Sequence, residues 1–226
     1  MSSKFIFNDH KDLKGSHALF SPSQYSWINY DEEKVIDKIR SQYRSSIGSE
    51  IHEYSADEIT LFHKKSNIRA ISQEIESYIY EKYKNDAPNY GLTLIKHLGY
   101  IQKEVFETVK YYVNDGIAYK MNVEQPLAYS ERIYGTADSI IFRDGLLRIH
   151  DLKTGFHEAK MEQLMVYSAI FCLEYAIKPS DIQMELRIYQ WDGITIHNPT
   201  VEDILPIMDK IITIEKIASS VEKENK

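Results

Sequence analysis

The sequence contains a single cysteine, Cys172, among its 226 residues. One thiol cannot form an intramolecular disulfide, and it cannot supply the cysteine cluster of a zinc ribbon or an iron–sulfur centre. Long apolar runs are also missing, since no segment approaches the ~18 consecutive apolar residues of a membrane span. The first ten residues place polar and charged side chains among apolar ones, which disfavours a signal peptide. We therefore expect a soluble, cytoplasmic protein that contacts no membrane.

Positive charge is in the minority, because 27 Lys and Arg residues face 34 Asp and Glu residues for a net charge of −7. This balance disfavours a protein that coats nucleic acid through bulk charge, although it permits a local basic groove. Basic residues of the expected early helices are candidates for contacts to a phosphate backbone. For any single one of them, a solvated basic surface is the simpler interpretation. These residues are Lys34, Lys38, Arg40, Arg44, Lys64 and Lys65.

Glycine and proline are sparse, with 9 and 6 residues, and no repeat or linker-like tract divides the chain. We expect one domain over residues 1–226, with a helical front at 20–115, a core containing the sheet at 117–200 and a closing helix at 201–221.

Apolar periodicity and turn residues predict the individual elements. Helices are expected from Ser21 to Trp27, from Asp31 to a break at Gly48, from there toward Lys65, and over 68–83, 92–113, 161–177 and 201–221. The 92–113 helix is expected to stop at Asn114-Asp115-Gly116. Strands are expected over 118–123, 127–129, 136–142, 146–152, 184–191 and 194–197, the last two forming a hairpin around Asp192-Gly193. The fold class is α/β, with a central mixed β-sheet flanked by helices and a helical N-terminal region.

The most informative segment is a predicted hairpin around Asp144-Gly145, a dipeptide typical of two-residue turns. With those residues as the turn, cross-strand partners have numbers that sum to 289. Asp138 and Asp151 then lie opposite each other on one face, with Cβ atoms roughly 4.5–5.5 Å apart. On the same face, Ile140 is expected against Ile149, Phe142 against Leu147 and Thr136 against Lys153, whereas His150 points to the other face.

Two facing carboxylates repel unless they take up a proton or hold a cation. Hard oxygen ligands suit Mg²⁺ or Mn²⁺, and Lys153 would be aimed at the water that such a metal activates. The alternative is a solvated sheet face, on which water and Lys153 screen the two acids. A register slip of one residue would move the whole set to the opposite face.

The motifs around this hairpin resemble the PD-(D/E)XK nuclease superfamily, in particular its RecB-like branch and related phage-encoded exonuclease-like proteins. Four segments match in order, and the opening Ser16–Ser23 segment with Trp27 extends the resemblance over most of the chain. Each motif alone is weak, whereas four in the right order are fairly specific. The segments are Gly48-Ser49-Glu50-Ile51-His52-Glu53, Gly135-Thr136-Ala137-Asp138, Asp151-Leu152-Lys153-Thr154-Gly155 and Gln163-Leu164-Met165-Val166-Tyr167.

The resemblance implies a restriction-endonuclease-like core and a role for each matched residue. Asp138 and Asp151 would be metal ligands, joined by the Leu152 carbonyl and by His52. Lys153 would orient the attacking water and stabilise charge on the scissile phosphate. Gln163 and Tyr167, which share a helix face, would position the DNA backbone or hold Lys153; without the resemblance they are ordinary helix residues, and His52 an ordinary histidine. Glu124 matches an acidic position one strand earlier. His150 and His157 are left out of the site, and Cys172 is expected to be a small core residue.

The function that follows is a Mg²⁺- or Mn²⁺-dependent deoxyribonuclease, expected to be an exonuclease in phage DNA recombination or processing, in the host cytoplasm if phage-encoded. The partners implied are linear duplex or single-stranded DNA and a phage annealing or replication protein. Because no Walker-type loop is present, any ATPase partner would be a separate chain. The lone cysteine excludes the iron–sulfur cluster of some branch members. Two alternatives are a nuclease-fold module that binds DNA ends or a protein without cutting and, ranked last, a phosphoesterase for small nucleotides.

Overall fold

The structure is a computed structural model that describes residues 18–155, 158–191 and 193–224. Ser16, His17, His157, Asp192 and the last two residues lie outside the described residues. The chain divides into two compact units, residues 1–45 and 46–226. None of the described helices is long and apolar enough to cross a membrane.

The first unit contains a short 3₁₀ helix, η2 (Pro22–Asn29), and the beginning of α1 (Glu32–Thr60). The indole of Trp27 donates a hydrogen bond to the Ser21 carbonyl at 2.8 Å and meets Phe20 edge-on. The helix predicted from Ser21 to Trp27 is therefore present, but in the tighter 3₁₀ form. The four basic side chains predicted on the helix that follows are all exposed; they are Lys34, Lys38, Arg40 and Arg44.

The second unit begins within α1 and continues through α2 (Ile68–Tyr83), α3 (Pro88–Leu98) and α4 (Lys103–Tyr119). Isoleucines at helical spacing bury one side of α2, as predicted. Polar contacts join α2 to α1, because the buried carboxylate of Glu50 accepts hydrogen bonds from Lys82 at 2.9 Å and from the Tyr83 hydroxyl at 2.7 Å. Lys65 is buried between Glu58 and Glu74, so it is not available for the phosphate contact considered above.

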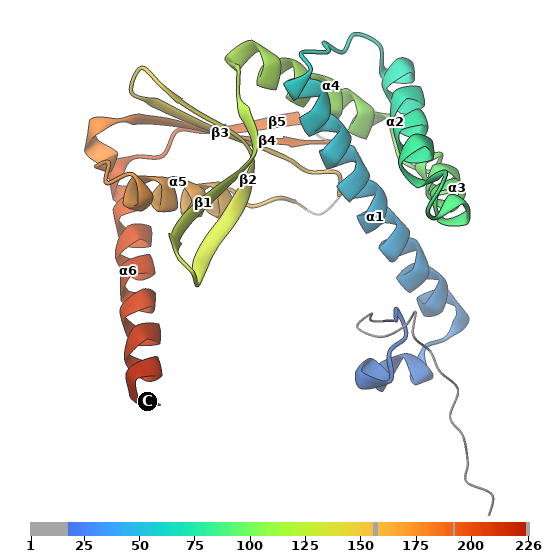
Figure 1. Ribbon diagram of the computed structural model, residues 1–226, viewed down its shortest axis with the longest axis horizontal. Coiled ribbons are helices and arrows are strands. Elements are labelled where there is room, and N and C mark those ends of the chain that lie inside the picture. The colour runs from blue at the N-terminus through green and yellow to red at the C-terminus, as the bar shows by residue number, and fades with distance from the viewer. Residues whose placement is uncertain (1–17, 156–157, 192, 225–226) are drawn as a thin grey trace, which may run out of the picture. The chain divides into compact units, whose positions relative to one another are not determined.

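A five-stranded mixed sheet follows, in the order β1-β2-β3-β4-β5 (Figure 1). The strands are β1 (Asn122–Ser130), β2 (Ile133–Arg143), β3 (Leu146–Leu152), β4 (Gln183–Gln190) and β5 (Gly193–His197). All neighbours are antiparallel except β3 and β4, which are parallel and connected through α5 (Glu162–Glu174). The 3₁₀ turn η3 (Pro179–Asp181) precedes β4, and α6 (Val201–Glu224) closes the chain. The predicted fold class, an α/β protein with a mixed sheet flanked by helices, is confirmed.

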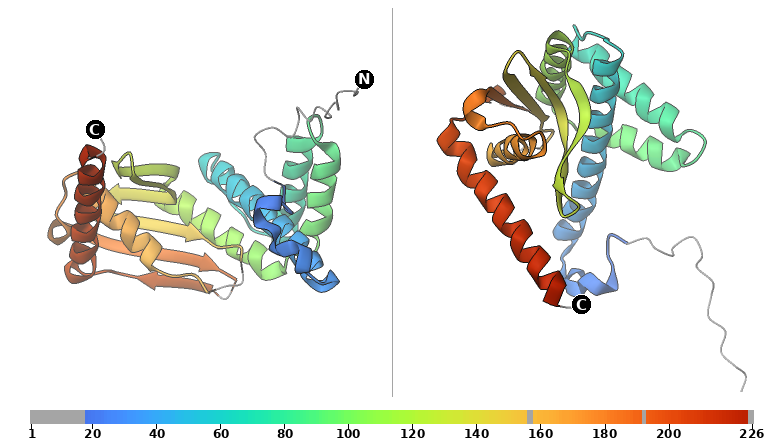
Figure 2. Two further views of the ribbon diagram at one scale, coloured as in Figure 1. Left: turned by 90° about the horizontal axis from the view of Figure 1, so that it is seen from below. Right: turned by 60° about the vertical axis from the view of Figure 1, so that its left-hand side comes forward.

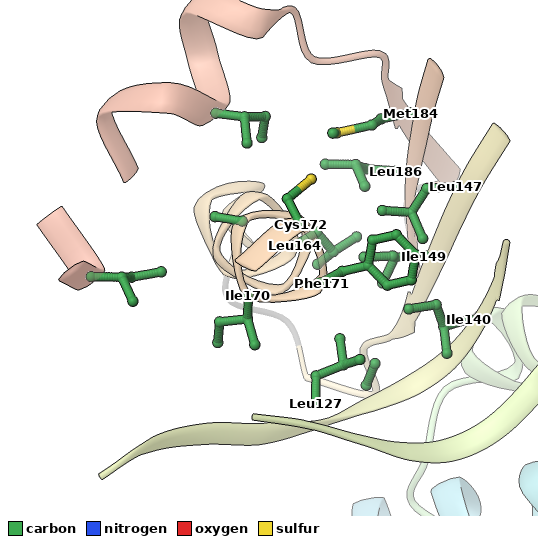
Figure 3. Close-up of a cluster of buried hydrophobic side chains, with 14 of the residues drawn as sticks. Leu127, Ile140, Leu147, Ile149, Leu164, Ile170, Phe171, Cys172, Met184 and Leu186 are labelled. Carbon is green, nitrogen blue, oxygen red and sulfur yellow. The ribbon is translucent and has the colours of Figure 1, made fainter. Parts of the chain in front are cut away.

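The two faces of the sheet are covered by different helices. On one face, α5 lies along the strands between the sheet and α6 (Figure 2). Leu147, Ile149 and Leu186 point from the central strands into a core cluster with Leu164 and Phe171 of α5 (Figure 3). Cys172 belongs to this cluster and is 1% exposed, as predicted for a small core residue. On the other face, α4 packs against β3 and β4.

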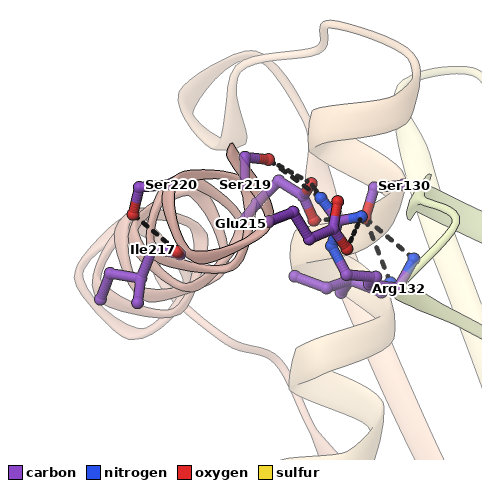
Figure 4. A network of polar contacts seen from close by, with 8 residues as sticks. Ser130, Arg132, Glu215, Ile217, Ser219 and Ser220 are labelled. Carbon is purple, nitrogen blue, oxygen red and sulfur yellow. Dashed lines mark hydrogen bonds and ion pairs between the residues drawn. The ribbon is translucent and has the colours of Figure 1, made fainter. Parts of the chain in front are cut away.

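The helix α6 is also fastened to the turn between β1 and β2 by charged groups (Figure 4). Glu215 accepts hydrogen bonds from the Ser130 hydroxyl at 2.6 Å and from the Arg132 guanidinium at 2.8 Å. Arg132 also donates to Ser219 at 2.9 Å. This network holds the tip of the hairpin beside the C-terminal half of the helix.

Two predicted helix boundaries in the helical N-terminal region are wrong. In both cases the residues that predicted the boundary form tertiary contacts instead. Gly48 does not interrupt α1; it is buried in an unbroken helix, where a Cβ would lie 2.8 Å from Oγ1 of Thr154. Asn114, Asp115 and Gly116 do not end α4. Asn114 exchanges hydrogen bonds with the Lys65 backbone, and a Cβ on Gly116 would overlap with Ile59.

Other boundaries also differ from the prediction. The expected 92–113 helix is two helices, α3 and α4, and α4 takes up the first two residues of the strand expected at 118–123. The helix then ends with Lys120 in the left-handed conformation. The strand expected at 127–129 is part of the longer β1. Of the strands that carry the two aspartates, β3 has the expected bounds, whereas β2 begins three residues before the expected 136–142 and ends one residue after it.

Candidate active site

The predicted hairpin register is confirmed. Asp144 and Gly145 both have positive φ, 51° and 74°, as a two-residue hairpin turn requires. The ladder between β2 and β3 pairs Arg143 with Leu146 and continues to Ser139 with His150. Every pair sums to 289, and Asp138 and Asp151 come next along the two strands. The predicted pairing of Thr136 with Lys153 does not form, because β3 ends at Leu152 and the Lys153 amide donates to the Tyr189 carbonyl of β4 at 2.8 Å.

Asp138 lies just beyond the last ladder pair between β2 and β3. Its Oδ2 accepts a hydrogen bond from the Leu152 amide at 2.9 Å, and Nδ1 of His52 on α1 lies 3.3 Å from the same oxygen. Burial alone would lower the pKa of His52, but its hydrogen bond and attraction to Asp138 outweigh this effect and raise the pKa. The helical histidine and the first aspartate of the predicted set therefore meet, although they are 86 positions apart in the sequence.

Asp151 is 3% exposed and carries a perturbed carboxyl group. Burial and the nearby charge of Asp138 raise its pKa to about 6, against the opposing attraction of Lys153. The Lys153 ammonium donates a hydrogen bond to Oδ1 at 3.0 Å and lies 2.9 Å from Oδ2, which accepts no hydrogen bond from the described residues. Oδ2 therefore has the ammonium as its charge partner, and its remaining lone pairs are available to a bound cation.

The residues of α5 reach the site from one helix face. The Gln163 side-chain carbonyl accepts a hydrogen bond from Lys153 Nζ at 3.1 Å, so Lys153 is held from two directions. Tyr167, one turn later, donates its hydroxyl proton to the Thr136 carbonyl at 2.7 Å. Gln163 thus touches the predicted site directly, whereas Tyr167 fastens α5 to the strand that carries Asp138.

Glu124 on β1 has an unusual backbone. It lies opposite Asp138, between the ladder pairs Val123–Ser139 and Gln125–Ala137, and its φ of 47° is left-handed. Burial, and then the charge of Asp138, raise the pKa of this carboxyl. A left-handed residue inside a strand is strained for any side chain other than glycine, and such strain is common at functional sites.

The alternation of side chains between the two faces of β2 is also irregular at Asp138. Ala137 and Ile140 both join the α5-side core cluster, although residues of odd and even number point to opposite faces of a regular strand. The alternation of faces therefore shifts between them, at Asp138. The predicted register brings the two aspartates next to each other beyond the last ladder pair, but the sequence pattern gave no signal of this irregularity.

His150 is separate from the site, as predicted. It points to the α4 face, where its Nδ1 lies 3.2 Å from the Tyr189 hydroxyl and its ring meets Tyr119 edge-on. Tyr189 in turn donates a hydrogen bond to Asp115 at 2.6 Å, and Arg187 donates to the same carboxylate at 3.0 Å. Burial, followed by the charges of two arginines, lowers the pKa of His150 to about 3.

The donor set suits a hard divalent cation. It comprises two carboxylates on adjacent strands, one of them buried, and an imidazole at the edge. In the present arrangement, Asp138 is engaged by the Leu152 amide and His52, and Asp151 by Lys153. Among the described residues, no three His, Cys, Asp or Glu side chains converge in a metal-binding geometry. Any cation would thus be held mainly by the two aspartates.

The fold and the site together define an α/β protein with an acid–acid–lysine cluster at the end of a central hairpin. The chain belongs to the family described as "Protein of unknown function (DUF2800)", whose model matches residues 17–224. No curated protein matches the chain. The solved structure titled "Crystal structure of SSO0001" is similar over 73% of this chain and 84% of that chain, with 13% sequence identity and a TM-score of 0.30.

Proposed function

We propose that the protein is a Mg²⁺- or Mn²⁺-dependent DNA nuclease of the PD-(D/E)XK type. One observation carries the proposal: the Lys153 ammonium is held between Asp151 and Gln163, just past the end of the strand next to the one that bears Asp138. Two carboxylates can hold a divalent cation that assists phosphodiester hydrolysis, and a neighbouring lysine can stabilise the charge that develops on the phosphate. A sheet that needed only stability would not place two acids at adjoining strand positions, one of them buried.

Asp138 and Asp151 would hold the cation, with the Leu152 carbonyl and His52 as further ligands. When bound, the cation would act as a Lewis acid toward a phosphate oxygen and the attacking water. Lys153 would donate hydrogen bonds to that water and stabilise the negative charge that develops on the phosphate. Gln163 would keep the ammonium in place, since its side-chain carbonyl accepts a hydrogen bond from it. Glu124 would contribute negative charge near Asp138.

The experiment that tests the function uses three DNA substrates: end-labelled linear duplex, closed circular duplex and single strands. The purified protein is incubated with each in Mg²⁺, in Mn²⁺ and in EDTA. Lys153→Ala is the site variant, and Lys210→Ala, which removes an exposed charge from α6, is the matched control. We expect metal-dependent loss of linear DNA by the wild type and by Lys210→Ala, with Lys153→Ala at least ~100-fold slower because it removes charge stabilisation.

The pattern of products separates the alternatives. Loss of linear substrates with the circle spared would establish an exonuclease, whereas cleavage of the circle would establish an endonuclease. If the wild type shifts DNA in a gel but cuts nothing in either metal, the non-cleaving binding module is correct. If it neither cuts nor shifts DNA, the net charge of −7 favours the module that binds a protein.

Metal binding is measured separately by titration calorimetry. Asp138→Ala and Asp151→Ala should each lose Mn²⁺ binding, because each removes one of two principal ligands. Lys153→Ala should bind Mn²⁺ nearly as well as the wild type, because it removes only a neighbouring cation. Undiminished binding by Asp151→Ala would refute the ligand assignment.

A further inference from the structure

The connection between β3 and α5 bears directly on the candidate site, because Lys153 begins it and Gln163 follows it. The side chain of Gln190, the last residue of β4, forms hydrogen bonds with this connection at two points. Its Nε2 donates a hydrogen bond to the Gly155 carbonyl at 2.8 Å, and its Oε1 accepts one from the Ala159 amide at 3.2 Å. One side-chain amide therefore joins two backbone groups that are four residues apart.

Gln190 is itself held by regular structure. It is 6% exposed, and its backbone carbonyl accepts a hydrogen bond from the Thr108 hydroxyl of α4 at 3.1 Å. The preceding residue, Tyr189, accepts the hydrogen bond of the Lys153 amide. The end of β4 thus holds the Lys153 amide through its own backbone, and holds Gly155 and Ala159 through the Gln190 side chain.

We propose that Gln190 is a positioning residue that sets the separation of Lys153 from Gln163 and thereby the direction of the Lys153 ammonium. This assignment rests on the proposed nuclease function for its catalytic consequence, although the two hydrogen bonds stand without it. Both of these hydrogen bonds go to backbone groups of the connection, so their effect on Lys153 passes through the backbone. Displacement of a catalytic group by about 1 Å can slow a reaction ~100-fold.

The amide is chemically specific for this task, because one end donates and the other accepts. Gln190→Glu keeps the length and one acceptor but loses the donor to Gly155. Gln190→Met keeps the length and loses both hydrogen bonds. Ser168→Ala is the matched control, since it also deletes a buried hydrogen bond, from the Ser168 hydroxyl to the Leu164 carbonyl within α5.

Two measurements on the full-length chain test the proposal. The first is hydrogen exchange of the Ala159 amide by NMR, which does not depend on activity. The second is single-turnover DNA cleavage in Mg²⁺, compared with DNA affinity in EDTA. We expect Gln190→Met to lose protection at Ala159 and to slow the cleavage step ~10–100-fold, with DNA affinity within twofold of the wild type. Gln190→Glu should lie between Gln190→Met and the wild type, and Ser168→Ala should change neither readout.

The outcomes separate this proposal from the proposed function. If Gln190→Met keeps Ala159 protected, or if cleavage by Gln190→Met is as fast as by the wild type, the positioning role is refuted. If Ser168→Ala slows cleavage as much as Gln190→Met, the effect is a general loss of stability and the positioning role is refuted as well. If the wild type cuts no DNA, the nuclease function and the catalytic consequence both fail, and exchange at Ala159 still decides whether Gln190 holds the connection.

Discussion

Replacing Gly48 with alanine tests how closely α1 approaches the segment that follows Lys153. In an open helix interior this change stabilises a protein by about 1 kcal/mol, because glycine has the lower helix propensity. Here the new methyl group would lie 2.8 Å from Oγ1 of Thr154. Overpacking of a buried site costs ~1–3 kcal/mol. We therefore expect Gly48→Ala to be destabilised by ~0–2 kcal/mol, the opposite sign to that of an unconstrained helix.

The double variant isolates the contact. Thr154→Ala removes Oγ1 and leaves the Thr154 Cβ at 3.9 Å from the added methyl group, an ordinary packing distance. In that background, Gly48→Ala should recover the helix gain and stabilise the protein by about 1 kcal/mol. The coupling energy of the two substitutions is then ~1–3 kcal/mol, which is typical of residues in direct contact.

The assay is guanidinium unfolding followed by the fluorescence of Trp191. The other tryptophan, Trp27, lies in the first compact unit and is replaced by phenylalanine in every variant. Four proteins complete the cycle: the Trp27→Phe background, the two single variants and the double variant. If Gly48→Ala alone is stabilised by the full helix gain, α1 does not lie against Thr154 and the reasoning fails.

Two further predictions concern buried ionisable groups. Lys65→Met should destabilise the protein by ~3–5 kcal/mol in thermal unfolding, because it leaves Glu58 and Glu74 without their shared cation. The control Lys64→Met, at an exposed position, should change stability by less than ~0.5 kcal/mol. Equal effects of the two substitutions would contradict the assignment. His150 has a folded-state pKa of about 3, below its ordinary value of 6.5. As the pH falls below 6.5, this histidine takes up a proton in the unfolded chain but not in the folded one. The free energy of unfolding therefore decreases by up to about 1.4 kcal/mol per pH unit. His150→Gln should remove about that slope between pH 6 and pH 4 in denaturant titrations, and an unchanged slope would show that this histidine is not buried in its neutral form.

The hairpin and its register could be predicted because the information is local. Asp144-Gly145 specifies the turn, and strict pairing then determines that the two aspartates come next to each other. Gln163 and Tyr167 were predicted from the spacing of helix residues together with a family resemblance, and the hydrogen bond from Lys153 to Gln163 agrees with one of the two roles considered for them.

The wrong helix boundaries have a common physical cause. Gly48 and Gly116 have low helix propensity, but each allows a close approach, to Thr154 and to Ile59 respectively. Asn114 favours turns in isolation, but its side chain bonds the Lys65 backbone. Tertiary contacts override propensity at these positions, and a single sequence does not show which distant residue will supply the contact. For the same reason, the sequence does not show the left-handed backbone of Glu124 or the two hydrogen bonds of the Gln190 side chain.

The composition of β1 also bears on how the protein avoids association with itself. Both outer strands of a sheet expose unpaired backbone groups that can recruit another chain. β1 carries Pro126, which has no N–H to offer, and the left-handed Glu124, which breaks the straight line that a docking strand would need. β5, at the opposite border, is only five residues long. The same strained residue that lies opposite Asp138 thus makes this border of the sheet a poor template for aggregation.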